Sequence, residues 1–79
     1  KLPILLALFE RVNRGEIDLD KTTWTFEEIH RASGSGDMQY QKAGQPYTVR
    51  HLAEKMIQIS DNTATNIIID HLGGMETLN

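Results

Sequence analysis

The sequence contains no cysteine, and this absence excludes two common ways of reinforcing a small protein. Neither a disulfide framework nor a thiolate metal site can supplement the core of these 79 residues. A domain of this size buries only about 60% of the surface that its unfolded chain exposes, so the stability of its own core is marginal. Cysteine usage also gives no information on the cellular compartment. We therefore expect one domain at most.

An excess of positive charge is lacking as well. Eight lysines and arginines stand against eleven acidic residues, and the formal net charge is −3. Proteins that hold nucleic acid or an anionic membrane surface usually carry a basic patch. We therefore expect no nucleic acid among the partners of this chain.

The chain also lacks a hydrophobic run long enough to cross a bilayer, which takes roughly 20 residues. Its start, "KLPILLALF", is similar to a secretory signal, but charged residues follow at once without a small-residue cleavage site. Apolar residues at helical spacing, including Leu5, Leu6 and Phe9, instead predict a buried core helix over about residues 1 to 14, which Gly15 ends. A chain that begins on a core helix is expected to be a piece of a longer protein.

Residues 15 to 47 are predicted to be rich in loops. Within them, "TTWTFEEIHRAS" is compatible with a strand, a short helix or both. The following "SGSGDMQYQKAGQPY" is rich in glycine and polar residues, so we expect a loop with one short helical turn. A loop of this length inside a compact domain is usually functional or a linker.

The aromatic and histidine residues give no sign of a cofactor or metal site. Trp24 and Phe26 have no arranged polar neighbours in the sequence, so we interpret them as packing residues. His30, His51 and His71 show no metal-ligand spacing along the chain. We therefore expect these histidines at the surface and predict neither a metal nor a cofactor.

Two further helices are predicted in the second half of the chain. The first covers about residues 49 to 59, because its apolar residues recur at intervals of three and four: Val49, Leu52, Ala53, Met56 and Ile57. Thr48 is its expected N-cap. The second helix covers about residues 62 to 72 and ends at a pair of glycines. The closing "METLN" is expected to start another helix, and the fold class is therefore mainly α.

The stretch "ISDNTATN" lies between these two helices and contains the candidate site. Asp61 is a favourable N-cap for the second helix, which is a purely structural role. Side chains two positions apart share one side of the chain where the backbone is extended. A tight, extended corner at residues 60 to 62 would therefore point Ser60 and Asn62 together into a cleft.

Several motifs in register carry a resemblance to a known family. "SDNTATN" is followed by "IIIDHLGG" and preceded by "YTVRHLAEKMIQI" and, further back, by "GSG". Together with "KLPILLALFERVNRGEIDLD", these stretches resemble the class A β-lactamase-like serine hydrolases, which are serine penicillin-recognising enzymes. That family has an SxxK motif at the start of a core helix, an SDN motif between helices and a KTG-type motif on a strand.

The resemblance implies a role for each matching residue. Lys1 corresponds to the lysine of SxxK, so the nucleophilic serine would stand three residues before it. Ser60 would relay a proton to the departing nitrogen, and Asn62 would bind the acylamino side chain of the substrate and the lysine. Ser35, in "GSG", is a substrate-binding candidate at the cleft rim.

The resemblance also implies a fold and a function for the parent protein. The chain would be the helical subdomain of the α/β (α+β) β-lactamase/transpeptidase-like fold, with the five-stranded sheet domain of the same protein absent from it. The leading activity is hydrolysis of β-lactam antibiotics through an acyl-enzyme. The alternatives are a D-Ala-D-Ala carboxypeptidase or transpeptidase acting on peptidoglycan-type peptides, and a non-catalytic helical interaction module.

Two expectations follow for the isolated chain and its location. The nucleophilic serine, the KTG-type strand and the Glu-bearing loop of class A β-lactamases all lie outside these residues, so we expect the 79-residue chain alone to be inactive. Enzymes of this family act on cell-wall-type substrates or antibiotics outside the cytoplasm. We therefore expect a secreted or periplasmic parent protein.

Overall fold

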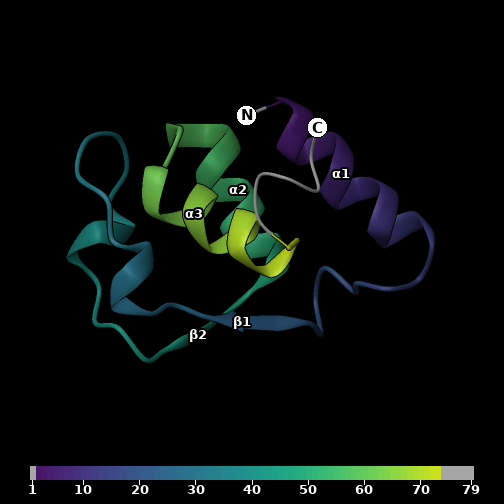
Figure 1. The fold of residues 1–79 in the computed structure, drawn as a ribbon, viewed down its shortest axis with the longest axis horizontal. Coiled ribbons are helices and arrows are strands. Elements are labelled where there is room, and N and C mark those ends of the chain that lie inside the picture. Colours follow the sequence, from purple (N-terminus) through teal and green to yellow (C-terminus); the bar gives the residue numbers. More distant parts are fainter. Residues whose placement is uncertain (1, 74–79) are drawn as a thin grey trace.

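A computed structural model describes residues 2–73 and shows a mostly helical chain (Figure 1). Helix α2 packs against α3, α1 lies beside α3, and a pair of short strands runs along one side of the helices. In chain order, the elements are α1 (Leu2–Asn13), β1 (Thr23–Thr25), the 3₁₀ turns η1 (Glu28–His30) and η2 (Met38–Tyr40), β2 (Pro46–Thr48), α2 (Val49–Ile59) and α3 (Asn62–His71). The helical character predicted from the sequence is confirmed.

Helix α2 has the predicted bounds and buries most of the predicted stripe. Val49, Leu52, Ala53 and Met56 are buried against α3 and the loops, whereas Ile57 is 56% exposed. The prediction that Ile57 faces inward is therefore wrong. Thr48 caps the helix as expected, because its hydroxyl accepts the backbone N–H of His51 at 3.2 Å.

Helix α1 turns a different face to the core than the sequence predicted. Ile4 and Leu8 are buried, while Leu6 and Phe9 are 64% and 40% exposed. The helix is apolar on nearly every side, so periodicity alone does not select the face that contacts α3. Within the described residues, no helix is long and apolar enough to span a membrane.

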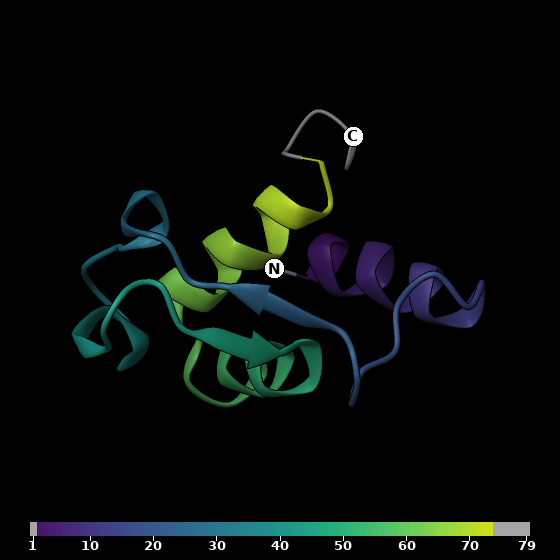
Figure 2. The ribbon, with the colours of Figure 1, turned by 90° about the horizontal axis from the view of Figure 1, so that it is seen from below.

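The stretch "TTWTFEEIHRAS", for which the sequence allowed a strand, a short helix or both, forms both a strand and a turn of 3₁₀ helix. Strand β1 pairs antiparallel with β2 (Figure 2), and Trp24 lies opposite Tyr47 in the register. Phe26, which follows β1, is fully buried, and Trp24 packs against the core from the strand, as expected of packing residues. The sequence did not indicate β2, because it begins at Pro46, a residue tolerated only at the edge of a sheet.

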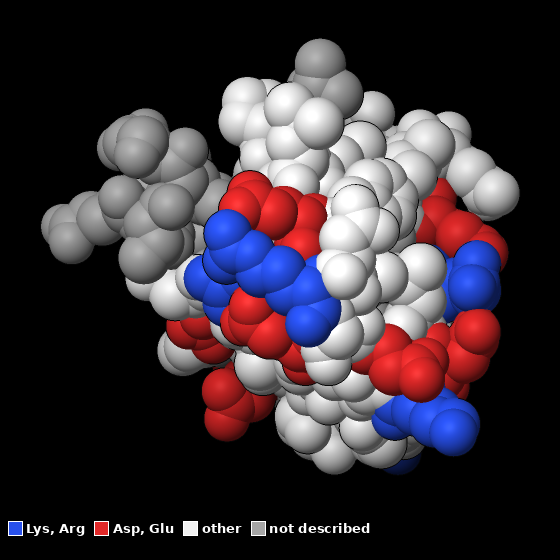
Figure 3. All heavy atoms as spheres, turned by 90° about the vertical axis from the view of Figure 1, so that its right-hand side faces the viewer, with Lys and Arg blue, Asp and Glu red and all other residues white. Residues whose placement is uncertain are grey.

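The charged residues form small mixed clusters over the surface. Figure 3 shows acidic and basic side chains interspersed on the side that lies to the right in Figure 1. Arg14 pairs with Glu10 and, at 3.8 Å, with Glu16, while Arg50 pairs with Asp20 at 2.6 Å.

The further helix predicted for "METLN" lies outside the described residues.

Candidate functional site

The corner between α2 and α3 is sharper than an extended link. Ser60 has a φ of 53° and is in the left-handed conformation, whereas Asp61 is extended with a φ of −61°. The prediction of an extended backbone throughout the corner is therefore wrong at Ser60. Among the described residues, Ser60 is the one non-glycine residue with positive φ. Such strain costs about 1–2 kcal/mol and is often found at functional sites.

Asp61 is fully buried and holds the corner in place. One carboxylate oxygen accepts the backbone N–H of Ala64 at 2.9 Å, which is the predicted N-cap of α3. The other oxygen accepts the backbone N–H of Met38 at 3.0 Å, at the start of η2. Asp61 thus joins two segments that are 23 residues apart in the chain. The sequence revealed the first contact but gave no sign of the second.

The loop that contains "GSG" lies directly against this corner. The backbone N–H of Asn62 donates to the carbonyl oxygen of Ser35 at 3.0 Å, and the Asn62 side-chain nitrogen donates to that of Ser33 at 3.2 Å. A Cβ on Gly34 would lie 2.9 Å from that side-chain nitrogen. Two of the predicted site residues, Ser35 and Asn62, are therefore neighbours.

The predicted catalytic pair is described only in part. Ser60 is exposed at the end of α2, immediately before the buried Asp61. Lys1 lies outside the described residues.

A salt bridge next to the corner was not predicted. The Lys55 ammonium lies 3.0 Å from both carboxylate oxygens of Asp37, and the Lys55 carbonyl accepts the backbone N–H of Asp61 at 3.2 Å. Lys55 is only partly exposed, and it connects α2 to the residue before η2.

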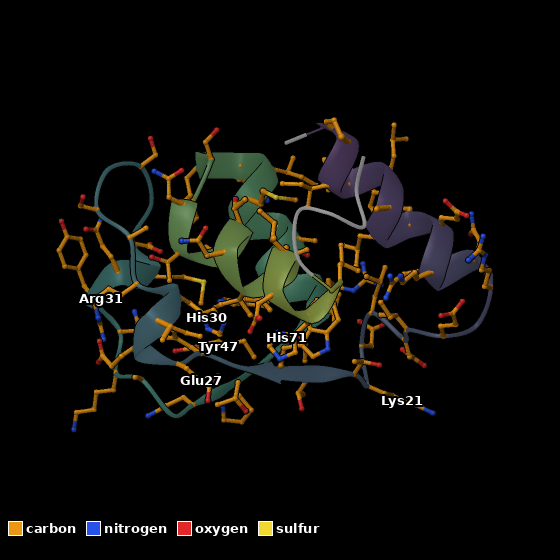
Figure 4. All side chains as sticks on the ribbon, viewed as in Figure 1. Lys21, Glu27, His30, Arg31, Tyr47 and His71 are labelled. Atoms are coloured by element: carbon orange, nitrogen blue, oxygen red, sulfur yellow. The ribbon has the colours of Figure 1, made fainter. Side chains whose placement is uncertain are left out.

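One histidine contradicts the prediction that all three lie at the surface. His30 is buried, and it lies close to His71 and Asp70, as Figure 4 shows for the two labelled histidines. The His30 and His71 rings are 6.0 Å apart, and the His71 ring stacks on Trp24 at 4.9 Å. Folding thus brings together residues that are widely separated in the sequence.

The side chains of His30, Asp70 and His71 offer ligand atoms within 4.8 Å of one another, a spacing that a divalent metal can use. The hydrogen bonds of His30 argue against such a role. Its Nδ1 accepts the backbone N–H of Glu27 at 3.0 Å, so the ring proton is on Nε2, which donates to Asp70 at 2.9 Å. A protonated nitrogen cannot ligate a metal, and the cluster is better described as a hydrogen-bonded pair beside a stacked imidazole.

The surface depression found in the structure is remote from the corner. It has a volume of about 400 Å³ and lies between the end of α1, the turn after it and the start of α2. Its lining residues are Val12, Gly15, Ile17, Asp18, Leu19, Asp20 and Arg50. None of the predicted site residues lines it.

Comparison with known proteins identifies the family. The sequence model of the β-lactamase enzyme family matches residues 1–79, the full length of the chain. The chain belongs to this family. The left-handed corner with its buried aspartate is thus a feature of a β-lactamase family member, and the resemblance inferred from the motifs is confirmed.

Solved structures support the assignment to the β-lactamase family. PBP-A, and a point mutant of PBP-A solved as an acyl-enzyme complex with penicillin G, each share 47% sequence identity with the chain and superpose with a TM-score of 0.92. A β-lactamase from Sphaerobacter thermophilus DSM 20745 shares 34% identity with a TM-score of 0.86.

The chain spans less than a third of the length of the solved proteins that it matches. Each match covers 98% of this chain but only 28–29% of the solved protein. The chain therefore corresponds to the mostly helical part of a larger β-lactamase-type fold. A search of curated proteins found no match.

Proposed function

We propose that the parent protein is a serine hydrolase of the β-lactamase family that is acylated by β-lactams. The observation that carries this proposal is the 47% identity with PBP-A, whose mutant was solved as an acyl-enzyme with penicillin G. The residues of the SDN corner and the loop that contacts it are all present in this chain.

In the proposed reaction, a serine three residues before Lys1 attacks the carbonyl carbon of the lactam. Lys1 takes the hydroxyl proton, and the carbon–nitrogen bond of the ring breaks as the acyl-enzyme forms. The departing nitrogen takes a proton from the Ser60 hydroxyl, and the Lys1 ammonium returns one to Ser60. The proton that leaves the nucleophilic serine is thus matched by one delivered to the ring nitrogen, and Ser60 acts as a relay between two nitrogens.

Asn62 is proposed to bind the acylamino side chain of the substrate. Its backbone and side-chain nitrogens both donate to carbonyl oxygens of the "GSG" loop, which restricts the orientation of its amide. A preorganised amide loses less conformational entropy when a ligand binds. Ser35 lies next to Asn62 and is exposed, so its side chain is a second candidate contact for the substrate.

β-Lactam hydrolysis is the leading activity that we propose, with a D-Ala-D-Ala carboxypeptidase or transpeptidase as the alternative. The similarity to a β-lactamase at 34% identity favours the first, whereas the higher identity to PBP-A favours an enzyme that shares its acylation chemistry. A glutamate in a loop beyond residue 79 would activate the deacylating water of a β-lactamase. The third possibility is a non-catalytic module that retains the fold.

Three assays on the full-length parent protein separate these activities. A fluorescent penicillin should label it covalently, hydrolysis of a chromogenic cephalosporin would indicate a β-lactamase, and release of D-alanine from a D-Ala-D-Ala peptide would indicate a carboxypeptidase. If the protein is neither labelled nor active in either assay, the enzymatic proposal is wrong and the non-catalytic module is supported.

The role of Ser60 requires a separate variant. Replacing Ser60→Ala should slow acylation by roughly 10²–10⁴-fold, the usual contribution of a positioned proton donor. Ser33→Ala is the matched control, because it removes a hydroxyl from the neighbouring loop but leaves the carbonyl that Asn62 uses. An S60A acylation rate close to that of wild type would reject the relay.

We also propose that the parent protein acts outside the cytoplasm, where cell-wall peptides and antibiotics are met. Fractionation of the producing cells, with the fluorescent penicillin as the probe, tests this. Label confined to the cytoplasmic fraction would contradict the proposal.

A further inference from the structure

One face of α3 contacts residues 30–35 along most of the length of the helix. Asn62, Asn66 and Asp70 are four residues apart, so their side chains form a stripe along the helix. Each of them hydrogen-bonds to a residue between positions 30 and 35. The contacts run in antiparallel order, from Asn62 at the "GSG" loop to Asp70 at His30.

Between Asn62 and Asp70, three hydrogen bonds join Thr63 and Asn66 of α3 to residues 30 and 32. The Asn66 side-chain nitrogen donates to the carbonyl oxygen of His30 at 3.1 Å. The hydroxyl of the buried Thr63 accepts the Ala32 N–H at 3.0 Å and donates to the Ala32 carbonyl at 3.2 Å. Residues 30 and 32 are thereby held against α3 through both side-chain and backbone atoms.

The far end of the stripe is the pair of His30 and Asp70. The His30 side chain is 3% exposed and uses both ring nitrogens, as described above, while the Asp70 side chain is 50% exposed. Eight residues of helix separate Asp70 from Asn62, which corresponds to roughly 12 Å. His30 and Asp70 are therefore too far away to touch a substrate bound at Asn62.

The loop at the near end is braced internally by Gln39. Its side-chain nitrogen donates to the carbonyl oxygens of Gly34 at 2.9 Å and Gly36 at 3.0 Å. These contacts stay within the loop and its following turn, so they stiffen the loop without fixing it to α3. The position of the loop over Asn62 depends instead on Asp61 and on the stripe.

We propose that His30 and Asp70 form a positioning contact that fixes the "GSG" loop, and through it the amide of Asn62, for recognition of the acylamino group of a penicillin. This inference rests on the proposed function. Because water competes for the half-exposed Asp70 carboxylate, loss of this hydrogen bond should have the effect of losing an ordinary one, about a fivefold change in a local opening equilibrium. The pair thus sets the fraction of time for which the loop stays in contact with α3.

Amide hydrogen exchange in the full-length parent protein tests the contact without any substrate. Asp70→Ala should speed exchange at the Ala32 and Asn62 N–H groups about fivefold, because both groups bond across the stripe. Asp70→Asn keeps an acceptor for His30 and should stay close to wild type. Glu54→Ala, an exposed acidic position on α2, is the matched control and should change neither amide.

His30 itself is tested by a variant that keeps half of its bonding. In His30→Asn, the amide oxygen replaces Nδ1 as the acceptor for Glu27 but cannot reach Asp70. This variant should therefore reproduce the exchange of D70A. If D70A and H30N both exchange at wild-type rates, the positioning contact does not exist.

Acylation kinetics then connect the contact to recognition. Benzylpenicillin carries an acylamino side chain, and 6-aminopenicillanic acid lacks the acyl group. D70A should lower the second-order acylation rate constant for benzylpenicillin by about two- to fivefold and leave that for 6-aminopenicillanic acid within twofold of wild type. An equal loss with both compounds would mean general damage and would overturn the proposal.

Failure of the proposed function and failure of the recognition role give different experimental results. If wild-type parent protein is not acylated by either penicillin, the proposed function and the recognition role of the pair both fall. Normal acylation of wild type, with faster exchange in D70A but an unchanged ratio of the two rate constants, would overturn the recognition role alone.

Discussion

The backbone of Gly36 lies so close to Asp61 that a Cβ added to the glycine would be 2.3 Å from the Asp61 Cγ and 2.6 Å from its Cα. Gly36 also has a φ of 102°, which side chains rarely adopt. The close approach explains why this loop position is a glycine: any side chain would push the loop away from the buried carboxylate that holds the corner.

Gly36→Ala is therefore expected to destabilise the parent protein and to slow its acylation. Gly44 offers a matched control, because it has a φ of 92° but no atom within 4 Å of an added Cβ. G44A should cost about 1–2 kcal/mol from backbone strain alone, and G36A about 2 kcal/mol more from the clash. Urea unfolding of both variants measures the difference. Equal losses in the two variants would contradict the contact with Asp61.

Asp61→Asn tests the double role of the buried carboxylate. An asparagine can accept only one of the two N–H groups, and its NH₂ group would face the other donor. We expect a loss of about 3 kcal/mol in the free energy of unfolding, since hydrogen bonds to a charged acceptor are involved. Thr48→Ala removes an ordinary N-cap and should cost only about 1 kcal/mol. A similar cost for both variants would mean that Asp61 is no more than a cap.

Ser60→Gly is expected to separate stability from activity. Glycine adopts the left-handed conformation of residue 60 without steric cost, so the variant should be about 0.5–1 kcal/mol more stable than wild type. Acylation should nevertheless slow as much as in S60A, because the hydroxyl is lost. Unfolding and acylation measured on one preparation provide the test, and a stable S60G with normal acylation would exclude Ser60 from the reaction.

The pair of Asp20 and Arg50 predicts a pH dependence. The hydrogen bond from the Arg50 guanidinium holds the pKa of Asp20 below its ordinary value of 3.8. A carboxyl whose pKa is lowered by folding stabilises the folded state above its unfolded pKa, and this contribution is lost as the pH falls through the folded pKa. The contribution should therefore be present at neutral pH, begin to decline as the pH falls toward 3.8, and be lost once the pH is below the lowered pKa of the folded state.

The measurement is an NMR titration of the Asp20 carboxyl carbon in the parent protein. Arg50→Gln should return the Asp20 pKa toward 3.8, whereas Arg14→Gln, which removes another exposed guanidinium, should leave it unchanged. An Asp20 pKa that does not respond to R50Q would show that the pair does not persist in solution.

Local sequence signals predicted the parts of the fold that local physics decides. The stripe of α2 is unambiguous because its other face is polar, and the caps Thr48 and Asp61 act on groups only three residues away. The buried face of α1 was predicted wrongly because an apolar helix has no polar side to orient it.

The details of the site were harder to predict because they arise from distant segments. The link between Asp61 and Met38, and the burial of His30 against α3, join residues 23 and 40 positions apart. The left-handed Ser60 has no signature either, because glycine, asparagine and aspartate are the residues that normally mark this conformation. The family and the position of the candidate site could thus be predicted from the motifs, but the contacts that hold the corner in place could not.

The antiparallel stripe between residues 30–35 and α3 also bears on the order of folding. Its contacts close loops of 27 to 40 residues, whereas α2 needs only neighbours within a few positions. Contacts between distant residues form late, since the entropy of loop closure must be overcome first. The candidate site is therefore expected to be among the last parts of this helical region to assemble and among the first to open, so that partial unfolding would remove the proposed recognition while α2 is still intact.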